Sequence, residues 1–213
     1  NYSATDSKGV DIVIGHKNTI GSGKNAFTYG ANLNISYAYS RWLKYPDSVN
    51  TPDYQCLTGK ETGIMLGWLA DGLYQSEEEI DNSPWPFGQR PRVGDIKYED
   101  LNGDGVVEYA DKAFVGRTNR PELTAGLNLS AAWMGFDLNM LLTGAALFDV
   151  SITGTYYNGN DDNTCLSETF KEGGNSPLYL VENAWRTDNT DGTYPRLTMN
   201  SPTNNNGLAS TFW

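Results

Sequence analysis

Three segments of the chain alternate apolar with small polar residues at period two, which is the pattern of a β-strand that has one apolar face. They are Ala31–Ser40, Leu127–Trp133 and Phe136–Thr143, and Val10–Gly15 repeats the pattern over a shorter length. In the first segment the apolar positions are Ala31, Leu33, Ile35, Tyr37 and Tyr39, and the positions between them are Asn32, Asn34, Ser36, Ala38 and Ser40. The pattern predicts an all-β chain of antiparallel strands.

The stretches between these segments predict turns and long connections. Met134 and Gly135 separate the last two segments, so we expect a hairpin with a two-residue turn. Glu61–Gln75 is apolar, broken by glycines and expected to be extended, whereas Ser76 with the three glutamates after it predicts one short helical turn. Leu178–Trp185 is a second helix candidate. The other connections are long and rich in Gly, Pro and Asn, which is uncommon in compact soluble domains.

One apolar and one polar face per strand fits two settings. In a soluble sandwich the apolar face covers a core, and in a transmembrane barrel it contacts lipid while the polar face lines a wet lumen. Three details favour the barrel. The polar faces use Asn, Ser, Thr and Ala instead of Lys and Glu, and the strands run to about 8–12 residues, close to the length that crosses a bilayer at a tilt. Aromatic residues also gather at strand ends, as they do at membrane interfaces: Tyr37, Tyr39, Trp42 and Tyr45 at one end, Trp133 and Phe136 at another. Composition alone leaves both settings open.

Composition and charge restrict the function. The chain has 213 residues with 23 Gly, 9 Pro and 12% aromatic residues, which excludes a coiled coil, a helical bundle and a disordered chain. Its net charge of -11 leaves no basic footprint, so we expect no nucleic-acid partner. The longest apolar stretch, Ala131–Val150, is interrupted by polar residues and does not predict a spanning helix. Because the chain starts at Asn1 and shows no signal peptide, we read it as a mature or excised fragment.

No catalytic constellation is expected. His16 is the sole histidine, and neither a Ser-His-Asp triad nor a histidine-rich metal site can be built around it. Cys56 and Cys165 both fall in polar stretches, and a disulfide between them would need an oxidising compartment. Four aromatic residues could stack on sugar rings, with packing at the rim as the alternative: Trp68, Tyr74, Trp85 and Phe87.

One loop has the residue pattern of a calcium site. Residues 100–111 fit D-x-[DN]-x-[DN]-G with an acid at the twelfth position, and Ca²⁺ prefers six to eight oxygen ligands. Gly105 permits the sharp bend, and the alternative is a polar loop of Asx turns that binds no ion. The predicted ligands are the side chains of Asp100, Asn102 and Asp104, the carbonyl of Val106, Glu108 through water, and Asp111 at the closing position. We expect such an ion to be structural.

A longer motif around this loop resembles a known family. Gly94–Val106 (GDIKYEDLNGDGV) is similar to a segment of the SusC/RagA-type TonB-dependent outer-membrane transporters, and Gly63–Glu79 is similar to a stretch that lies upstream of it in that family. Val115, Gly116 and Pro121, followed by a strand, a tight turn and Gly135–Leu138, keep the family's order, and Lys8–Asp11 resembles its K-G-V-E segment. The resemblance covers residues 8–150 and is loose beyond them.

The resemblance implies a 22-stranded barrel in the outer membrane of a Gram-negative bacterium. Such a barrel imports glycans or peptides, works with a SusD-like surface lipoprotein and is energised by TonB. Residues 1–213 then form one partial barrel domain from the C-terminal half, with the calcium-type loop within 94–120 and no plug domain. The alternative from the residues alone is a soluble, calcium-stabilised β-module that binds carbohydrate or a partner protein.

Overall fold

The computed structural model describes residues 2–150, 178–197 and 207–212, and it divides the chain into two compact units. Unit 1 comprises residues 1–51, 56–64 and 117–149, and unit 2 comprises residues 52–55, 65–116 and 150–213. The single partial barrel domain that the family resemblance implies stays a prediction. The described strands are mostly antiparallel, which confirms the all-β expectation.

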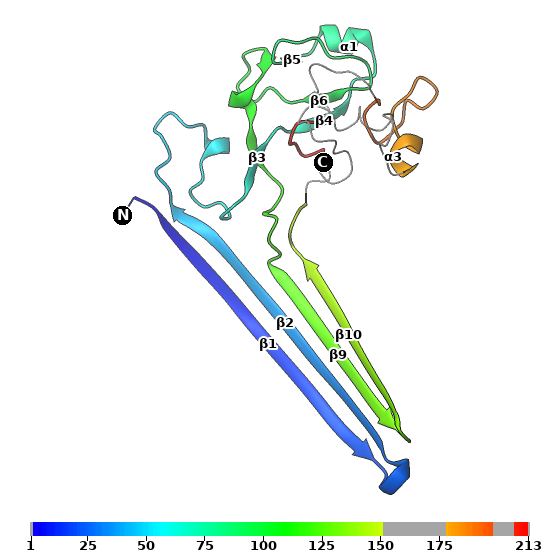
Figure 1. Ribbon diagram of the computed structural model, residues 1–213. Helices are drawn as coiled ribbons and strands as arrows, with labels where there is room; N and C mark the ends of the chain where they lie inside the picture. The colour runs from blue at the N-terminus through cyan, green and yellow to red at the C-terminus, as the bar shows by residue number, and fades with distance from the viewer. Residues whose placement is uncertain (1, 151–177, 198–206, 213) are drawn as a thin grey trace, which may run out of the picture. The chain divides into compact units, whose positions relative to one another are not determined.

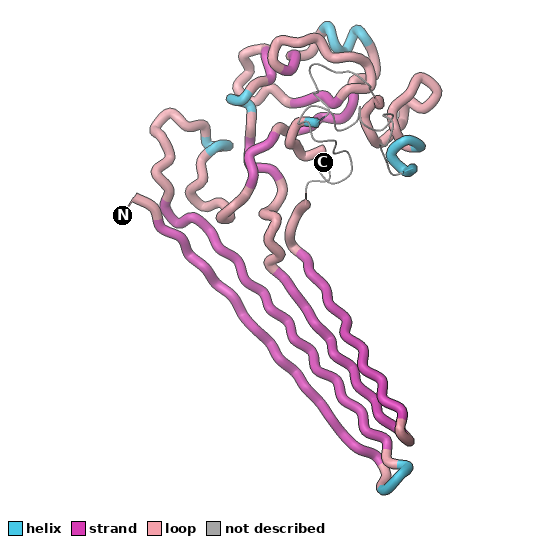
Figure 2. The backbone as a smooth tube through the Cα atoms, in the orientation of Figure 1, coloured by secondary structure: helices cyan, strands magenta, loops and turns pink. Residues whose placement is uncertain are grey.

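Unit 1 is built on a four-stranded antiparallel sheet with the strand order β1-β2-β9-β10 (Figure 1). The strands are β1 (Ala4–Ile20), β2 (Phe27–Lys44), β9 (Leu123–Trp133) and β10 (Phe136–Ala146). A short connection containing the 3-10 helix η1 (Gly23–Asn25) joins β1 to β2. Figure 2 shows the four strands as long, nearly straight ribbons that run side by side.

The predicted hairpin between β9 and β10 is confirmed, because Phe136 pairs directly with Trp133. Its turn residues, Met134 and Gly135, both have positive φ values, of 50° and 85°. This is the primed turn geometry whose twist matches that of the flanking strands.

The first strand is much longer than its sequence pattern predicts. The alternation indicated Val10–Gly15, whereas β1 has 17 residues. Lys8, His16 and Asn18 break the apolar alternation, but they pair in register with Tyr39, Ala31 and Tyr29 of β2. Pairing with a neighbouring strand therefore extends β1 through residues whose own pattern would have ended it.

Unit 2 contains short elements around a small core. The strands are β3 (Met65–Gly67), β4 (Ala70–Leu73), β5 (Trp85–Pro86), β6 (Ile96–Tyr98), β7 (Val106–Val107) and β8 (Ala113–Val115), which pair as β3-β8, β4-β6 and β5-β7. The helices are α1 (Glu77–Asp81) and α3 (Leu178–Glu182), with 3-10 turns η2 (Asp53–Gln55) and η3 (Tyr109–Asp111). Neither described α-helix is long and apolar enough to span a membrane.

The core of unit 2 consists of Trp68, Ile96, Tyr98 and Val107, and residues from the C-terminal part of the chain pack against it. Leu208 and Phe212 contact this cluster, and the backbone of Trp68 bonds to Ala209 and Thr211. The last described residues are therefore part of the fold of unit 2.

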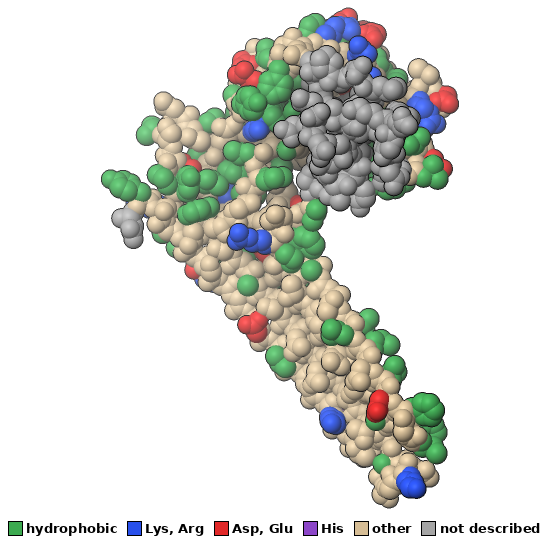
Figure 3. All heavy atoms as spheres, in the orientation of Figure 1, with side chains coloured by type: hydrophobic (Ala, Val, Ile, Leu, Met, Phe, Trp, Pro, Cys, Tyr) green, Lys and Arg blue, Asp and Glu red, His purple; other side chains and the backbone are tan. Residues whose placement is uncertain are grey.

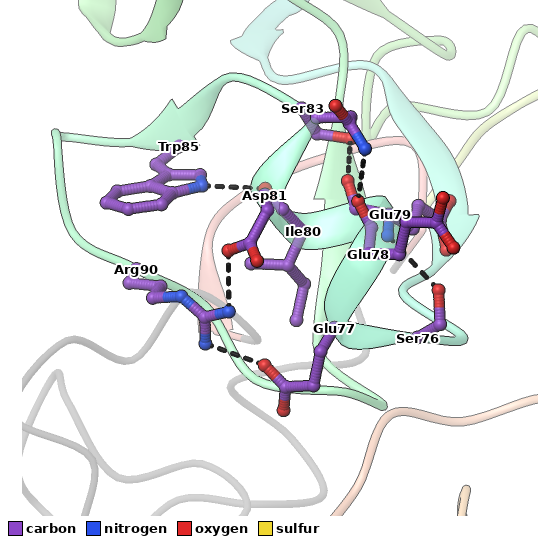
Figure 4. A network of polar contacts seen from close by, with 10 residues as sticks. Ser76, Glu77, Glu78, Glu79, Ile80, Asp81, Ser83, Trp85 and Arg90 are labelled. Carbon is purple, nitrogen blue, oxygen red and sulfur yellow. Dashed lines mark hydrogen bonds and ion pairs between the residues drawn. The ribbon is translucent and has the colours of Figure 1, made fainter.

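Helix α1 begins where the sequence predicts. Ser76 is its N-cap, and the Ser76 hydroxyl accepts a hydrogen bond of 3.1 Å from the Glu79 N–H. Figure 4 shows how the following loop is tied to this helix. The Arg90 guanidinium lies 2.7 Å from both the Glu77 and the Asp81 carboxylates, and the Trp85 indole N–H donates to the Ile80 carbonyl at 2.8 Å.

Candidate functional site

The register of the long sheet aligns the apolar positions of all four strands on one face. Directly paired residues point to the same side of a sheet, and Leu33 pairs with both Ile14 and Leu127, which in turn pairs with Leu142. The same alignment repeats along the sheet. We call the resulting surface the apolar face, and it comprises Val10, Ile12, Ile14, Ile20, Phe27, Tyr29, Ala31, Leu33, Ile35, Tyr37, Tyr39, Leu123, Ala125, Leu127, Leu129, Ala131, Trp133, Phe136, Leu138, Met140, Leu142, Gly144 and Ala146.

Large side chains of the apolar face are exposed. The exposed fraction is 59% for Ile14, 60% for Leu138 and 49% for Leu142. A soluble sandwich would bury these residues under a second layer, yet they are open in the described part of the chain. An apolar surface of this extent on a water-exposed sheet would be an aggregation hazard, so it implies a nonaqueous environment or a partner.

Aromatic residues border the apolar face at both ends. Near the turns, Phe27 stacks on Tyr29 at 5.9 Å between ring centroids and pairs in register with Trp133. At the other end, Tyr37 and Tyr39 lie 5.9 Å apart. The positions between Tyr29 and Tyr37 on β2 are aliphatic, so this strand reads aromatic, aliphatic, aromatic along one side.

Basic side chains accompany the aromatic residues at the end away from the turns. The Arg41 guanidinium lies 5.1 Å from the centre of the Tyr39 ring, and Lys8 pairs in register with Tyr39. Lys8 also forms an ion pair of 2.7 Å with Asp6. Aromatic rings together with long basic side chains are typical of the boundary between hydrocarbon and headgroups.

The opposite face of the sheet is polar and hollowed. Ser7 bonds to Ser40 and Thr19 to Thr28 across β1 and β2, each at 2.9 Å. A hollow of about 660 Å³ at mid-length is lined mainly by the positions between the apolar ones, such as Asn34. Val13 and Leu141 also lie on this face and are exposed. Figure 3 shows charged side chains only sparsely on the visible side of the sheet and apolar ones along the β10 edge.

Residues 100–111 form a tight loop held by its own side chains. Asp100 accepts backbone N–H bonds from Gly103 and Gly105 at 2.7 and 2.8 Å, and Asp104 accepts one from Val106 at 2.9 Å. Burial raises the pKa of Asp100, but the hydrogen bonds from these N–H groups lower it by more. The pKa of Asp100 therefore lies below its usual value, and the carboxylate is ionised. Asn102 donates to Asp104 at 2.9 Å.

The predicted closing ligand is held by backbone groups. Asp111 is fully buried, and its two carboxylate oxygens accept N–H bonds from Leu101 and Asn102 and from Glu108. The Glu108 side chain in turn accepts from the Asp111 N–H, which forms a capping box on η3. Among the described residues no group of three or more His, Cys, Asp or Glu side chains is placed to hold a metal ion. The donors are the oxygen ligands that Ca²⁺ prefers, but the geometry also fits the Asx-turn alternative, so calcium binding stays a prediction.

The motif that resembles the SusC/RagA family consists largely of residues that build unit 2. Gly94 has a φ of 87°, and a Cβ there would collide with the Trp185 ring. Asp95, which is 5% exposed, forms a 2.7 Å ion pair with Arg196. Ile96 lies in the core. Along β6, Ile96 and Tyr98 are buried, and Lys97 between them is partly buried.

The four aromatic residues predicted to stack on sugars do not form one exposed platform. Trp68 is 3% exposed and Tyr74 is fully buried, so a ligand could reach neither ring without rearrangement of the core. Burial raises the pKa of Tyr74 to about 12. Trp85 is partly buried beside α1, and Phe87 is 37% exposed, 5.4 Å from the Tyr109 ring.

The predicted disulfide lies partly outside the described residues. Cys165 is not among them, so the Cys56–Cys165 pairing stays a prediction. The Cys56 thiol lies 3.7 Å from the Thr51 carbonyl and donates to it.

One cluster of charged residues was not anticipated from the sequence. The backbone of Glu61 pairs with that of Arg41 in an isolated β-bridge. The Arg117 guanidinium forms ion pairs with both the Glu61 and the Glu122 carboxylates. Glu61 is far from Arg117 and Glu122 in the chain, and none of the three belongs to a motif. Their proximity depends on the pairing of residues 59–62 with the end of β2, for which the sequence offers no signal.

Comparison with known proteins finds a solved structure with a similar fold, but it does not identify a family. No protein-family model matches the chain, and no curated protein matches it. Among solved structures, a chain of "Structure of the RagAB peptide transporter" is similar over 94% of this chain, with a TM-score of 0.52 and 19% sequence identity. The match covers 21% of that chain, so the present chain spans about a fifth of its length. The similarity supports a distant relationship in fold to a β-domain of a transporter.

Proposed function

We propose that this chain is part of the wall of an outer-membrane transporter, with its apolar face against lipid and its polar face toward a wet lumen. The observation that supports this proposal is the continuous, exposed apolar face of β1, β2, β9 and β10. The soluble-module alternative would need a second layer over that face.

The dimensions of the apolar face suit a bilayer. Tyr29 and Tyr37 are eight residues apart on β2, about 26 Å at roughly 3.3 Å per residue. With a strand tilt of about 35–45° this distance spans roughly 18–22 Å of depth. The outer aromatic residues, Phe27 and Tyr39, are twelve residues apart and bracket roughly 28–33 Å by the same arithmetic. The apolar band of outer-membrane barrels, about 25 Å tall, falls between these values.

The connections of the sheet suggest its orientation. The turns β1-β2 and β9-β10 are short and leave from the same end of the sheet, whereas the long connection between β2 and β9 leaves from the other. Outer-membrane barrels have short periplasmic turns and longer extracellular loops. We therefore assign the end of the sheet with Met134 and Gly135 to the periplasm.

For the full-length protein we propose TonB-dependent import of glycans or peptides with a SusD-like lipoprotein as partner. The Gly94–Val106 motif and the fold similarity to a peptide transporter support this assignment. Deletion of the gene should abolish uptake of one substrate class. Growth on peptides and on oligosaccharides as sole nutrients would separate the two classes, and unchanged growth and uptake on both would contradict the import proposal.

We also propose that residues 100–111 bind calcium in a structural role. Ionised Asp100 and the neighbouring Asn102 and Asp104 supply hard oxygens on one short loop. An ion there would stabilise unit 2 through η3, since Asp111 links the start of the loop to Glu108.

Site-directed spin labelling tests the membrane placement directly. In a background with Cys56 and Cys165 replaced by serine, nitroxides are attached singly at positions 125–132 of β9, and the chain is reconstituted in liposomes. Labels at odd positions should be more accessible to oxygen, which partitions into lipid, and labels at even positions to a water-soluble nickel complex. Equal accessibility along the strand, or the opposite alternation, would contradict the proposal.

A further inference from the structure

One guanidinium on the apolar face is not paired with an acid. Arg41 lies two residues beyond Tyr39 on β2, and its guanidinium is 5.1 Å from the centre of the Tyr39 ring, on the same side of the sheet. The Arg41 side chain is exposed, and within the part of the chain that the structure describes it forms neither an ion pair nor a side-chain hydrogen bond. Stacking on a ring uses the flat face of a guanidinium and leaves its N–H edge free to donate.

The acids nearest to Arg41 along the sheet have other cations as partners. Asp6 pairs in register with Arg41, but its carboxylate forms the 2.7 Å ion pair with Lys8. The backbone of Glu61 pairs with that of Arg41, but the Glu61 carboxylate lies 3.9 Å from Arg117 Nη1. The N–H groups of Arg41 are therefore the donors that this end of the apolar face still offers to a ligand.

The position of Arg41 along the strand corresponds to the headgroup level of a bilayer. Leu33 lies midway between Phe27 and Tyr39, and Arg41 is eight residues further along β2. At roughly 3.3 Å per residue and a strand tilt of about 35–45°, Arg41 is roughly 19–22 Å from the middle of the apolar face. The hydrocarbon core of a bilayer ends about 15 Å from its midplane, and the headgroups extend to about 20–22 Å.

The two ends of the apolar face differ in charge. At the end with the turns, the face finishes in Phe27, Trp133 and Phe136, and no Lys or Arg of the four described strands lies on it there. Lys17 is close to that end, but it pairs with Gly30 and therefore lies on the polar face. The cationic end is the one that the proposed orientation places at the outer leaflet.

We propose that Arg41 binds the phosphate group of an anionic lipid in the outer leaflet. A guanidinium donates in a fork that matches phosphate oxygens, and the acyl chains of the same lipid would lie along the apolar face. The net charge of -11 gives the chain no general attraction to anionic lipids, so a preference for them must come from a local group. The proposal rests on the membrane placement proposed above and goes beyond it by naming a lipid partner and its binding residue.

Lipid titration of the protein in neutral detergent micelles, with bound lipid counted by native mass spectrometry, tests this proposal with three probes. They are phosphatidic acid, phosphatidylcholine with the same acyl chains, and inorganic phosphate. Phosphatidic acid should bind at least about fivefold more tightly than phosphatidylcholine, and an equal concentration of inorganic phosphate should not displace it. If the two lipids bind equally, or if inorganic phosphate displaces phosphatidic acid, the proposal is wrong.

Two matched variants connect the binding to Arg41. Arg41→Gln and Lys17→Gln each remove one positive charge from the same sheet, but from opposite faces. Arg41→Gln should weaken the binding of phosphatidic acid about fivefold and leave that of phosphatidylcholine unchanged, whereas Lys17→Gln should bind both lipids as the parent does. An unchanged affinity of Arg41→Gln, or an equal loss in both variants, would refute the site. The comparison of lipids on the parent protein needs no variant.

The spin labels on β9 report the membrane placement separately. If their accessibility alternates as expected but phosphatidic acid is not preferred, the lipid proposal alone is wrong. If the alternation is missing, the membrane placement is contradicted, and the lipid proposal is contradicted with it.

Discussion

A single arginine placed on either face of β10 should separate the two possible environments of the sheet. Leu142 lies in the row Ile14–Leu33–Leu127–Leu142, midway between the aromatic ends of the apolar face. Thr143, its neighbour in the chain, points to the polar face, and both side chains are exposed. Leu142→Arg and Thr143→Arg therefore introduce the same charge at nearly the same depth on opposite sides.

The expected cost follows from that depth. An arginine that faces lipid at the bilayer midplane costs about 2–4 kcal/mol, and each 1.4 kcal/mol changes an equilibrium tenfold. Leu142→Arg should then reduce the folding equilibrium constant in liposomes roughly 30- to 700-fold. Thr143→Arg should stay within about 0.5 kcal/mol of the parent chain, as surface substitutions usually do.

The assay is urea unfolding from phosphatidylcholine liposomes, followed by tryptophan emission. On a water-facing sheet Leu142, at 49% exposure, would tolerate arginine with little change. Equal effects of the two substitutions, or a larger effect of Thr143→Arg, would refute the placement of the apolar face in lipid.

Three further predictions concern unit 2. Asp104→Ala should lower its melting temperature and abolish the shift that a calcium chelator causes in the parent chain; if a chelator leaves the parent unchanged, no ion stabilises the loop. Loss of the buried Asp95–Arg196 ion pair through Asp95→Asn should destabilise unit 2 by about 3–5 kcal/mol in denaturant titrations, and a change below about 1 kcal/mol would contradict the structural role of that pair. The hydrogen bond from the Gln75 N–H and the ion pair with Lys97 hold the pKa of Glu79 below its usual value. The ionised Glu79 side chain therefore stabilises the folded state above the unfolded pKa near 4.5, and this contribution is lost as pH falls through the lower, folded pKa. Glu79→Gln should therefore flatten the fall of the melting temperature below pH 5, and an unchanged acid profile would exclude this contribution.

The sequence predicts the sheet well where each strand alone shows the pattern. The faces of β2 and β10 follow directly from alternation, and the turn at Met134–Gly135 follows from its position between two alternating segments. The extent of β1 could not be predicted, because His16 and Asn18 lie on its apolar face and are retained by pairing with β2. Local pattern predicts a strand, but its length depends on the neighbour.

The candidate sites also differ in how far the sequence predicts them. Residues 100–111 are recognisable because all their oxygen ligands lie on one loop, whereas Glu61 meets Arg117 and Glu122 only through pairing across the chain. Aromatic type was a poor guide to exposure, since Trp68 and Tyr74 fill the core of unit 2. A residue type predicts what a side chain can do, and only the tertiary contacts determine whether a ligand can reach it.

Backbone hydrogen bonding adds a requirement to the membrane proposal that side chains do not address. No described strand pairs with the outer edge of β1 or of β10. Inside a bilayer each unsatisfied N–H or C=O costs several kcal/mol, so strands span membranes only in closed sheets. If the apolar face lies in lipid, both edges must therefore pair with further strands, either elsewhere in the same protein or in another copy. Amide hydrogen exchange in liposomes should then show protection at the outward-facing amides of β1 as strong as at those bonded to β2. Fast exchange confined to the outer edge would mean that this edge meets water, and a lipid-embedded wall would be excluded.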